Sequence, residues 1–333
     1  MSDYFYSSAR VRALETGLLG REGLLRLAEA PSMAALLSQL EELGWKALYG
    51  EDGRTVLREQ MLLEHLEQAF GEIASLTEEV NNRVFLLWRY PYDCNNLKAA
   101  IKCFLRNTDP TPMMFDFGTV STEKIQNAVR TNDFSVLPTH LAQAAREATE
   151  AYAKNKNPQV IDLLLDRACY REMLAAAEES GVAFVLKLIQ TKIDLTNLVM
   201  CIRMKRINNG VAGKLLLAES LLDGGTVQKD LIMSLFAMEE RALWERLLYT
   251  DYKHFAEAMP SIAPTLTEIE RAADNAFMAV VREARFISCG PEVLIGYLLG
   301  VESQTRNLRI IMAGKAASLP TETVMERIRE SYV

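Results

Sequence analysis

The residues best suited to catalysis or metal binding are few and widely spaced in this chain. Three histidines and five cysteines are dispersed over 333 residues, namely His65, His140, His254, Cys94, Cys103, Cys169, Cys201 and Cys289. They show no zinc-ligand spacing, and no two cysteines form a CxxC pair. An odd, scattered set of thiols is typical of reduced core cysteines. We therefore expect no metal site and no disulfide framework.

Motifs for phosphate binding and nucleophilic catalysis are also missing. The sequence contains no GxxxxGK[ST], GxGxxG, GxSxG or HExxH pattern, and Gly210–Lys214 is too short for a phosphate loop. Adjacent carboxylates such as Glu41–Glu42 and Glu239–Glu240 point about 100° apart on a helix, so both usually face water. We expect no catalytic residue, no cofactor and no small-molecule substrate.

Charge and hydropathy exclude two further classes of protein. Lys and Arg number 37 against 44 Asp and Glu, which gives a net charge of −7. Nucleic-acid binding favours a basic footprint, so no nucleic-acid partner is expected. The longest apolar run, Val293–Val301, is far shorter than the roughly 18 residues that span a bilayer. The N-terminus carries no apolar signal segment, and we expect a soluble, cytosolic chain.

The elements that position these residues are predicted to be helices. Apolar residues recur at intervals of three and four, for example at Leu62, Leu66, Phe70 and Ile73. Alternating runs of β-branched residues, which would indicate strands, are missing. The pattern predicts an all-α protein.

One phrase recurs along the chain and indicates internal repeats. Asp93–Lys102 and Asp194–Arg203 both have the form Asp-x-x-Asn-Leu-x-x-x-Ile-basic, and Gln304–Met312 is a looser third copy with Gln304 at the acidic position. The interval is about 100 to 110 residues, too long for common short helical repeats. Upstream acids recur at a similar interval, at Glu64, Asp162 and Glu270. We predict three related helical lobes, with boundaries at residues 1–112, 113–222 and 223–333.

The repeated polar residues have a structural and a functional interpretation. Asn96, Asn197 and Asn307 lie beside core leucines, so each amide either bridges helix ends and neighbouring helices or contributes to a polar ring that faces a partner. The bridging role is favoured because repetition needs only a shared fold. Asp93 and Asp194 are interpreted as N-terminal charges or caps of the following helix.

A basic cluster follows each copy of the phrase and could contact a partner. The candidate partner-binding residues are Lys98, Lys102 and Arg106 in the first copy, Arg203, Lys205 and Arg206 in the second, and Arg309 and Lys315 in the third. Such clusters suit acidic proteins or lipid headgroups. The alternative is an ordinary solvated helix face.

Three segments together resemble a known family. YPYDCNNLKAAIK at Tyr90–Lys102, KIDLTNLVMCIRMK at Lys192–Lys205 and NLRIIMAGK at Asn307–Lys315 are similar to the C subunit of the V/A-type rotary ATPases, whose eukaryotic equivalent is the d subunit. Gln304 departs from the acidic position of the first two copies.

The resemblance implies a fold, a location and a role. It implies an all-α, pseudo-three-fold funnel, peripheral on the cytoplasmic face of the membrane and monomeric when isolated. One copy per complex would join the central-shaft subunits D and F to the membrane proteolipid ring. The chain would be a non-catalytic part of the central stalk, coupling ATP hydrolysis or synthesis to proton or sodium transport. A helical adaptor or scaffold unrelated to ion transport is the alternative, and an enzyme with an unrecognised site comes third.

Overall fold

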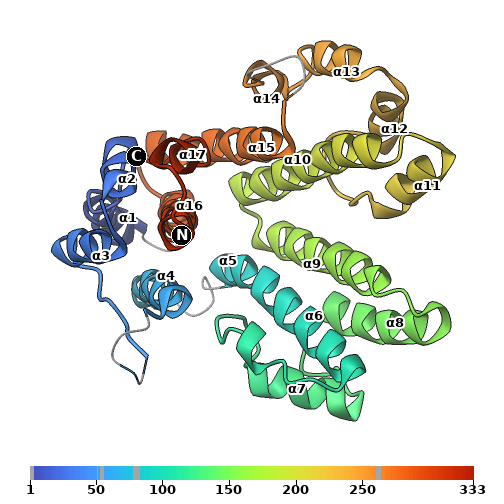
Figure 1. The fold of residues 1–333 in the computed structure, drawn as a ribbon, viewed down its shortest axis with the longest axis horizontal. Coiled ribbons are helices and arrows are strands. Elements are labelled where there is room, and N and C mark those ends of the chain that lie inside the picture. The colour runs from blue at the N-terminus through green and yellow to red at the C-terminus, as the bar shows by residue number, and fades with distance from the viewer. Residues whose placement is uncertain (1–3, 51, 53–55, 78–82, 260–263) are drawn as a thin grey trace. The chain divides into compact units, whose positions relative to one another are not determined.

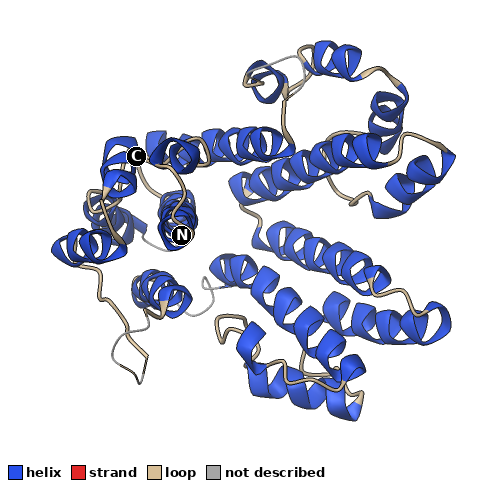
Figure 2. Cartoon of the chain, viewed as in Figure 1, coloured by secondary structure: helices blue, strands red, loops and turns tan. Residues whose placement is uncertain are grey.

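The computed structural model describes residues 4–50, 52, 56–77, 83–259 and 264–333 of the chain. Within these ranges the regular elements are α-helices and short 3-10 helices (Figures 1 and 2). The single β contact among the described residues is an isolated antiparallel bridge between Tyr49 and Val56. The prediction of an all-α protein is confirmed.

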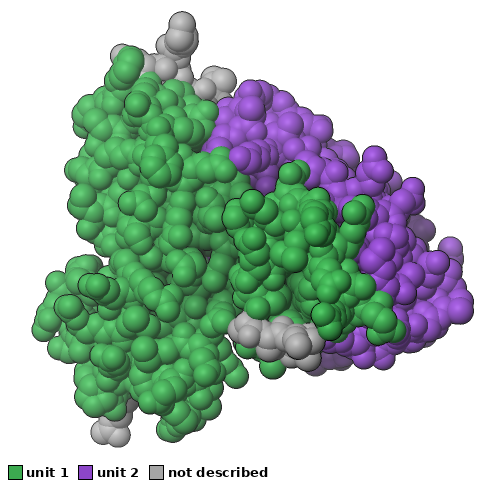
Figure 3. Space-filling model, turned by 90° about the horizontal axis from the view of Figure 1, so that it is seen from above, with its two compact units in different colours: residues 1–79, 239–333 green, residues 80–238 purple. Residues whose placement is uncertain are grey.

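The chain forms two compact units, which are coloured separately in Figure 3. Unit 2 is continuous and covers residues 80–238, whereas unit 1 combines the two ends of the chain, residues 1–79 and 239–333. This division describes compactness and does not test the three predicted lobes, which stay a prediction.

Unit 2 contains eight α-helices among its described residues. They are α5 (Arg83–Leu86), α6 (Tyr90–Arg106), α7 (Thr122–Thr131), α8 (Thr139–Asn155), α9 (Gln159–Ser180), α10 (Ala183–Ile207), α11 (Val211–Ser220) and α12 (Lys229–Ala237). Helix α9 packs against α8, α10 and α6. Its buried residues include Ile161, Leu165 and Ala168, which follow helical spacing. Gly181, with φ of 65°, ends α9 in the left-handed conformation that glycine adopts readily.

Unit 1 is built around one long helix. Its first part holds α1 (Tyr4–Glu15), α2 (Arg21–Glu29), α3 (Met33–Glu42) and α4 (Arg58–Ser75). Its second part holds α13 (Glu240–Leu247), α14 (Lys253–Glu257), α15 (Leu266–Val281), α16 (Pro291–Ala316) and α17 (Thr321–Met325). Helices α1, α2 and α4 pack against α16, so the two ends of the chain share one core.

The apolar run Val293–Val301 lies in α16, and all nine of its residues are buried. Two glycines in this run let the C-terminal Tyr332 approach the helix closely. A Cβ on Gly296 would lie 2.6 Å from the Tyr332 hydroxyl oxygen, and one on Gly300 would lie 3.0 Å from the Tyr332 Cβ. The run therefore lies at the centre of a protein core. No helix in the described part of the chain has the length and apolarity to cross a membrane.

Candidate functional site

The acidic residue of the first repeated phrase fastens α6 to the segment before α7. Asp93 lies in the first turn of α6 with its side chain fully buried. The backbone N–H and the hydroxyl of Thr119 donate to Oδ2 over 3.0 and 2.6 Å, and the N–H of Val120 donates to Oδ1 over 3.0 Å. Burial raises the pKa of Asp93, while these three hydrogen bonds act to lower it.

The second copy repeats this arrangement in the middle of a helix. Asp194 of α10 accepts from the N–H and hydroxyl of Thr226 over 2.8 and 2.6 Å, and from the N–H of Val227 over 3.1 Å. Helix α10 begins eleven residues earlier, at Ala183. The interpretation of Asp194 as an N-terminal cap is therefore wrong, because its carboxylate binds the backbone of a distant segment instead.

Both carboxylates meet the same tripeptide, Gly-Thr-Val, at residues 118–120 and 225–227. A Cβ on Gly118 would lie 1.9 Å from Asp93 Oδ1, and a Cβ on Gly225 would lie 2.0 Å from Asp194 Oδ1. Only glycine leaves room for the carboxylate at this approach. The two identical tripeptides are a signal in the sequence that the repeated Asp-x-x-Asn-Leu phrase alone does not reveal.

The three repeated asparagines form matching pairs of hydrogen bonds. The Nδ2 of Asn96 donates to the Phe115 carbonyl over 2.7 Å, and the Phe115 N–H donates back to Oδ1 over 2.9 Å. Asn197 makes the same exchange with Leu222, and Asn307 makes it with Arg329. All three side chains are buried. Each amide thus replaces two backbone partners and joins a long helix to the chain that follows it.

The third copy departs from the pattern at Gln304. Its Oε1 accepts from the backbone N–H of Leu19 over 2.6 Å, so this position binds the segment after α1 instead of a segment downstream. The side chain is buried, like the two aspartates at the same position of the phrase. The amide can accept this bond without bringing a charge into the core.

Two basic residues of the first cluster pair with acids on α9. Lys98 Nζ and Asp166 Oδ1 are 2.5 Å apart, as are Lys102 Nζ and Asp162 Oδ1. The two lysines are one helical turn apart on α6, and the two acids are one turn apart on α9, so the pairs form a ladder between the helices. Arg106, in the last turn of α6, is exposed.

The other basic candidates have varied surroundings. Lys205 is buried, and its Nζ donates to the Phe236 carbonyl over 2.9 Å. The Nε of Arg309 lies 2.9 Å from the Oε2 of Glu59 on α4. Lys315 lies half-buried in the last turn of α16, Arg203 is half-buried and Arg206 is exposed. Arg309 and Lys315 belong to unit 1 and the other six residues belong to unit 2. The partner-binding role of all eight stays a prediction.

The histidines and cysteines are spread through the structure. Among the described residues, no three His, Cys, Asp or Glu side chains form a group that could hold a metal ion. His65 stacks on Trp45 with ring centroids 3.6 Å apart, and burial lowers the pKa of His65 to about 4. All five cysteines are free thiols, and four of them are buried.

Comparison with known proteins gives matches over nearly the whole chain. Residues 7–327 match the family model described as ATP synthase (C/AC39) subunit. The C subunit of the V-type sodium ATPase of Enterococcus hirae is 26% identical over 250 residues, which cover 74% of this chain and 75% of that protein. The C subunit of the A-type ATP synthase of Thermococcus kodakarensis is 23% identical over 342 residues, covering 98% and 90%. That of Thermococcus gammatolerans is 25% identical with the same coverage.

Proposed function

Because the chain belongs to the ATP synthase (C/AC39) subunit family, we propose that it is the central-stalk connector of a V/A-type ATPase or ATP synthase. It joins the central-shaft subunits D and F to the membrane proteolipid ring, as a single copy on the cytoplasmic face. It catalyses no reaction itself. Its role is to couple ATP hydrolysis or synthesis in the rest of the complex to proton or sodium transport.

The observation that carries this proposal is the set of repeated attachments at Asn96, Asn197 and Asn307. Each ties a long helix to the following segment through two hydrogen bonds to backbone. A buried donor or acceptor that loses its partner costs about 1–3 kcal/mol. A helix held in this way resists displacement under load, as a part that transmits torque requires.

The lysine–aspartate ladder supports the same role. It links α6 to α9 side by side through Lys98, Lys102, Asp162 and Asp166. Helices that are tied along their length, and not only through their connecting loops, move together. The names of the relatives disfavour the alternative, an adaptor unrelated to ion transport, because these relatives are parts of a sodium ATPase and of ATP synthases.

The proposal is tested by asking whether the chain bridges shaft and ring. Purified shaft subunits D and F are mixed with the proteolipid ring in lipid nanodiscs, with and without the chain. We expect shaft and ring to co-migrate in size-exclusion chromatography only when the chain is present, at one copy per ring. Failure of the chain to bind either partner, or association of shaft and ring without it, would contradict the connector role.

A further inference from the structure

Three short segments of this chain lead into a helix in the same way. Gly118–Val120 ends two residues before α7 begins, Gly225–Val227 ends two residues before α12, and Gly17–Leu19 ends two residues before α2. The last residue of each segment donates its backbone N–H to the same position of the repeated phrase, occupied by Asp93, Asp194 and Gln304. Gly17–Leu19 is therefore the counterpart of the two Gly-Thr-Val tripeptides.

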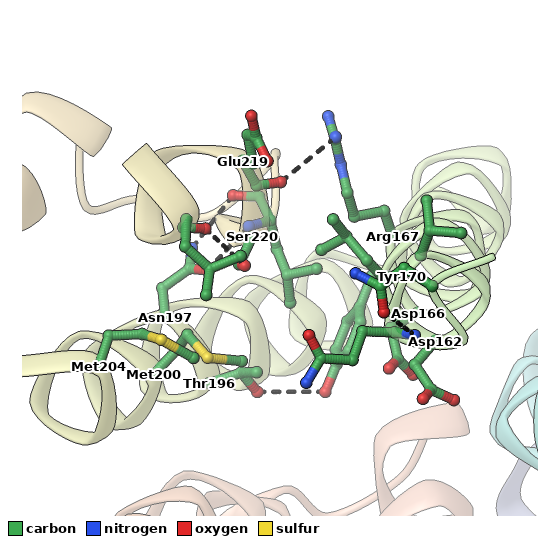
Figure 4. Close-up of a pocket in the computed structure, with 16 residues that line it drawn as sticks. Asp162, Asp166, Arg167, Tyr170, Thr196, Asn197, Met200, Met204, Glu219 and Ser220 are labelled. Carbon is green, nitrogen blue, oxygen red and sulfur yellow. Dashed lines mark hydrogen bonds between the residues drawn. The ribbon is translucent and has the colours of Figure 1, made fainter. Parts of the chain in front are cut away.

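In the first two copies, one stretch of chain makes both attachments to the long helix. Phe115, the partner of Asn96, comes three residues before the first tripeptide. Leu222, the partner of Asn197 (Figure 4), comes three residues before the second. Each tripeptide is thus held near its carboxylate by the neighbouring pair of amide hydrogen bonds.

The third copy divides these attachments between two distant parts of the chain. Asn307 pairs with Arg329, which follows α16. Gln304 accepts instead from Leu19, which lies 285 residues upstream. All four residues belong to unit 1. The Asn307 pair does not hold the segment that Gln304 holds, so one attachment can open while the other stays closed.

The joint at Gln304 also has fewer and weaker hydrogen bonds than its two counterparts. Asp93 and Asp194 each accept from two backbone N–H groups and one hydroxyl. Within the described part of the chain, the Gln304 side chain has one hydrogen bond, and its acceptor atom belongs to a neutral amide. Hydrogen bonds to an ionised group are roughly twice as strong as those between neutral groups. Opening the Gln304 joint therefore costs less than opening either carboxylate joint.

Packing of Leu18 adds an apolar contact to this joint. A Cβ on Gly300, one turn before Gln304 on α16, would lie 3.0 Å from the Leu18 Cδ1. Leu18 and Leu19 are half-buried, however, and Gly17 is exposed. Segments with few hydrogen bonds and partial exposure open locally at a small fraction of the cost of global unfolding.

We propose that Gly17–Leu19 is a releasable strap on α16, which opens while the two Gly-Thr-Val joints stay closed. Release frees the Gln304 amide and uncovers α16 at Gly300, whereas the Asn307 pair stays in place. Of three related joints, one opens readily and two do not. The inference goes beyond the connector role and does not depend on it.

Amide hydrogen exchange in the purified full chain, resolved to single residues, tests this order of opening. We expect the Leu19 amide to exchange about 10- to 100-fold faster than the amides of Val120 and Val227, after correction for intrinsic rates, because one hydrogen bond replaces three. Exchange at Leu19 that is not faster than at both valines would overturn the proposal.

Removing the acceptor tests whether Gln304 holds the strap. Gln304→Met keeps a side chain of similar length without the amide oxygen, so we expect exchange at Leu19 to quicken by a further three- to ten-fold, on the order of one lost hydrogen bond. Val120 and Val227 should exchange as in the parent chain. Gln68→Met, at an exposed position of α4 in the same unit, is the matched control and should change none of the three amides. Unchanged exchange at Leu19 in Gln304→Met, or an equal increase at the valines, would also overturn the proposal.

Discussion

Asn197 and Leu222 exchange two hydrogen bonds in the interior of unit 2. The Asn197 Nδ2 donates to the Leu222 carbonyl over 3.1 Å, and the Leu222 N–H donates to the Asn197 Oδ1 over 2.8 Å. The amide thus supplies both partners that the backbone of Leu222 needs just after α11. Asn96 and Asn307 make the same exchange with Phe115 and Arg329. The paired hydrogen bonds are therefore common to all three copies of the repeated phrase.

Removing one amide should destabilise the fold measurably. Asn96→Ala leaves the N–H and carbonyl of Phe115 without these partners, so we expect the free energy of unfolding to fall by about 2–4 kcal/mol. Asn95→Ala is the matched control, because Asn95 is the preceding residue on the same helix but is exposed. It should change stability by no more than about 0.5 kcal/mol. Urea unfolding followed by circular dichroism measures both, and equal effects of the two substitutions would argue against the bridging role.

The close approach of glycine to the buried carboxylate gives a second prediction. Gly118→Ala places a Cβ against Asp93 Oδ1, which three hydrogen bonds hold in position. The expected loss of stability is about 1–3 kcal/mol. Gly71→Ala is the control: its Cβ would have no neighbour within 4 Å, and alanine favours the helix by up to about 1 kcal/mol. Thermal unfolding should thus separate the two in opposite directions, and a stabilised Gly118→Ala would contradict the packing described.

Exchanging the charges of one ion pair tests the ladder between α6 and α9. Lys98→Asp sets two carboxylates side by side, and we expect it to lower the free energy of unfolding by about 1 kcal/mol. The double variant Lys98→Asp with Asp166→Lys should recover most of this loss, as a double-mutant cycle would measure. No recovery would mean that the pair contributes nothing to stability.

The same exchange variant separates the two roles considered for the basic residues. If Lys98 serves only the fold, the exchange restores both stability and assembly of the complex. If a partner also binds this lysine, stability returns while docking stays weak. Joint charge reversal of Lys98, Lys102 and Arg106 extends this test. If a partner binds these residues, docking should weaken by more than the loss of stability alone explains.

Burial of His65 predicts a pH-dependent stability. Its pKa falls to about 4 in the folded chain from an ordinary value of 6.5, so the unfolded chain binds more protons between these values. Stability therefore falls as the pH drops, by about 2 kcal/mol between pH 7 and pH 5. His65→Phe, which can still stack on Trp45, should remove this component.

Urea unfolding at the two pH values measures the effect of His65. A His65→Phe variant with an unaltered pH dependence would show that another group is responsible.

The elements of this fold could be predicted from the sequence because helical periodicity is a local property. The apolar spacing indicated helices throughout, and the repeated phrase was enough to identify Asn96, Asn197 and Asn307 as related positions. The short apolar run Val293–Val301 was correctly excluded as a membrane span. The prediction of helices needs only residues that lie within a few turns of each other.

The partners of the repeated residues could not be predicted, because they lie far away along the chain. Asp194 was interpreted as a helix cap, yet its bonds reach Thr226 and Val227 across two loops and a helix. Likewise, the ladder joins Lys102 to Asp162, on a helix that begins more than fifty residues later. Tertiary packing determines which acid meets which base, and neither spacing nor composition contains that information.

The most direct test of the connector role is the ratio of ions pumped to ATP hydrolysed, measured in proteoliposomes. Complexes assembled with and without the chain are reconstituted, and ion uptake and phosphate release are followed together. Without the chain, we expect ATP hydrolysis by the catalytic head to remain largely intact and ATP-driven ion uptake to be abolished. Adding the purified chain back should restore uptake. Complexes that lack the chain yet pump ions at the normal ratio to ATP would contradict the account.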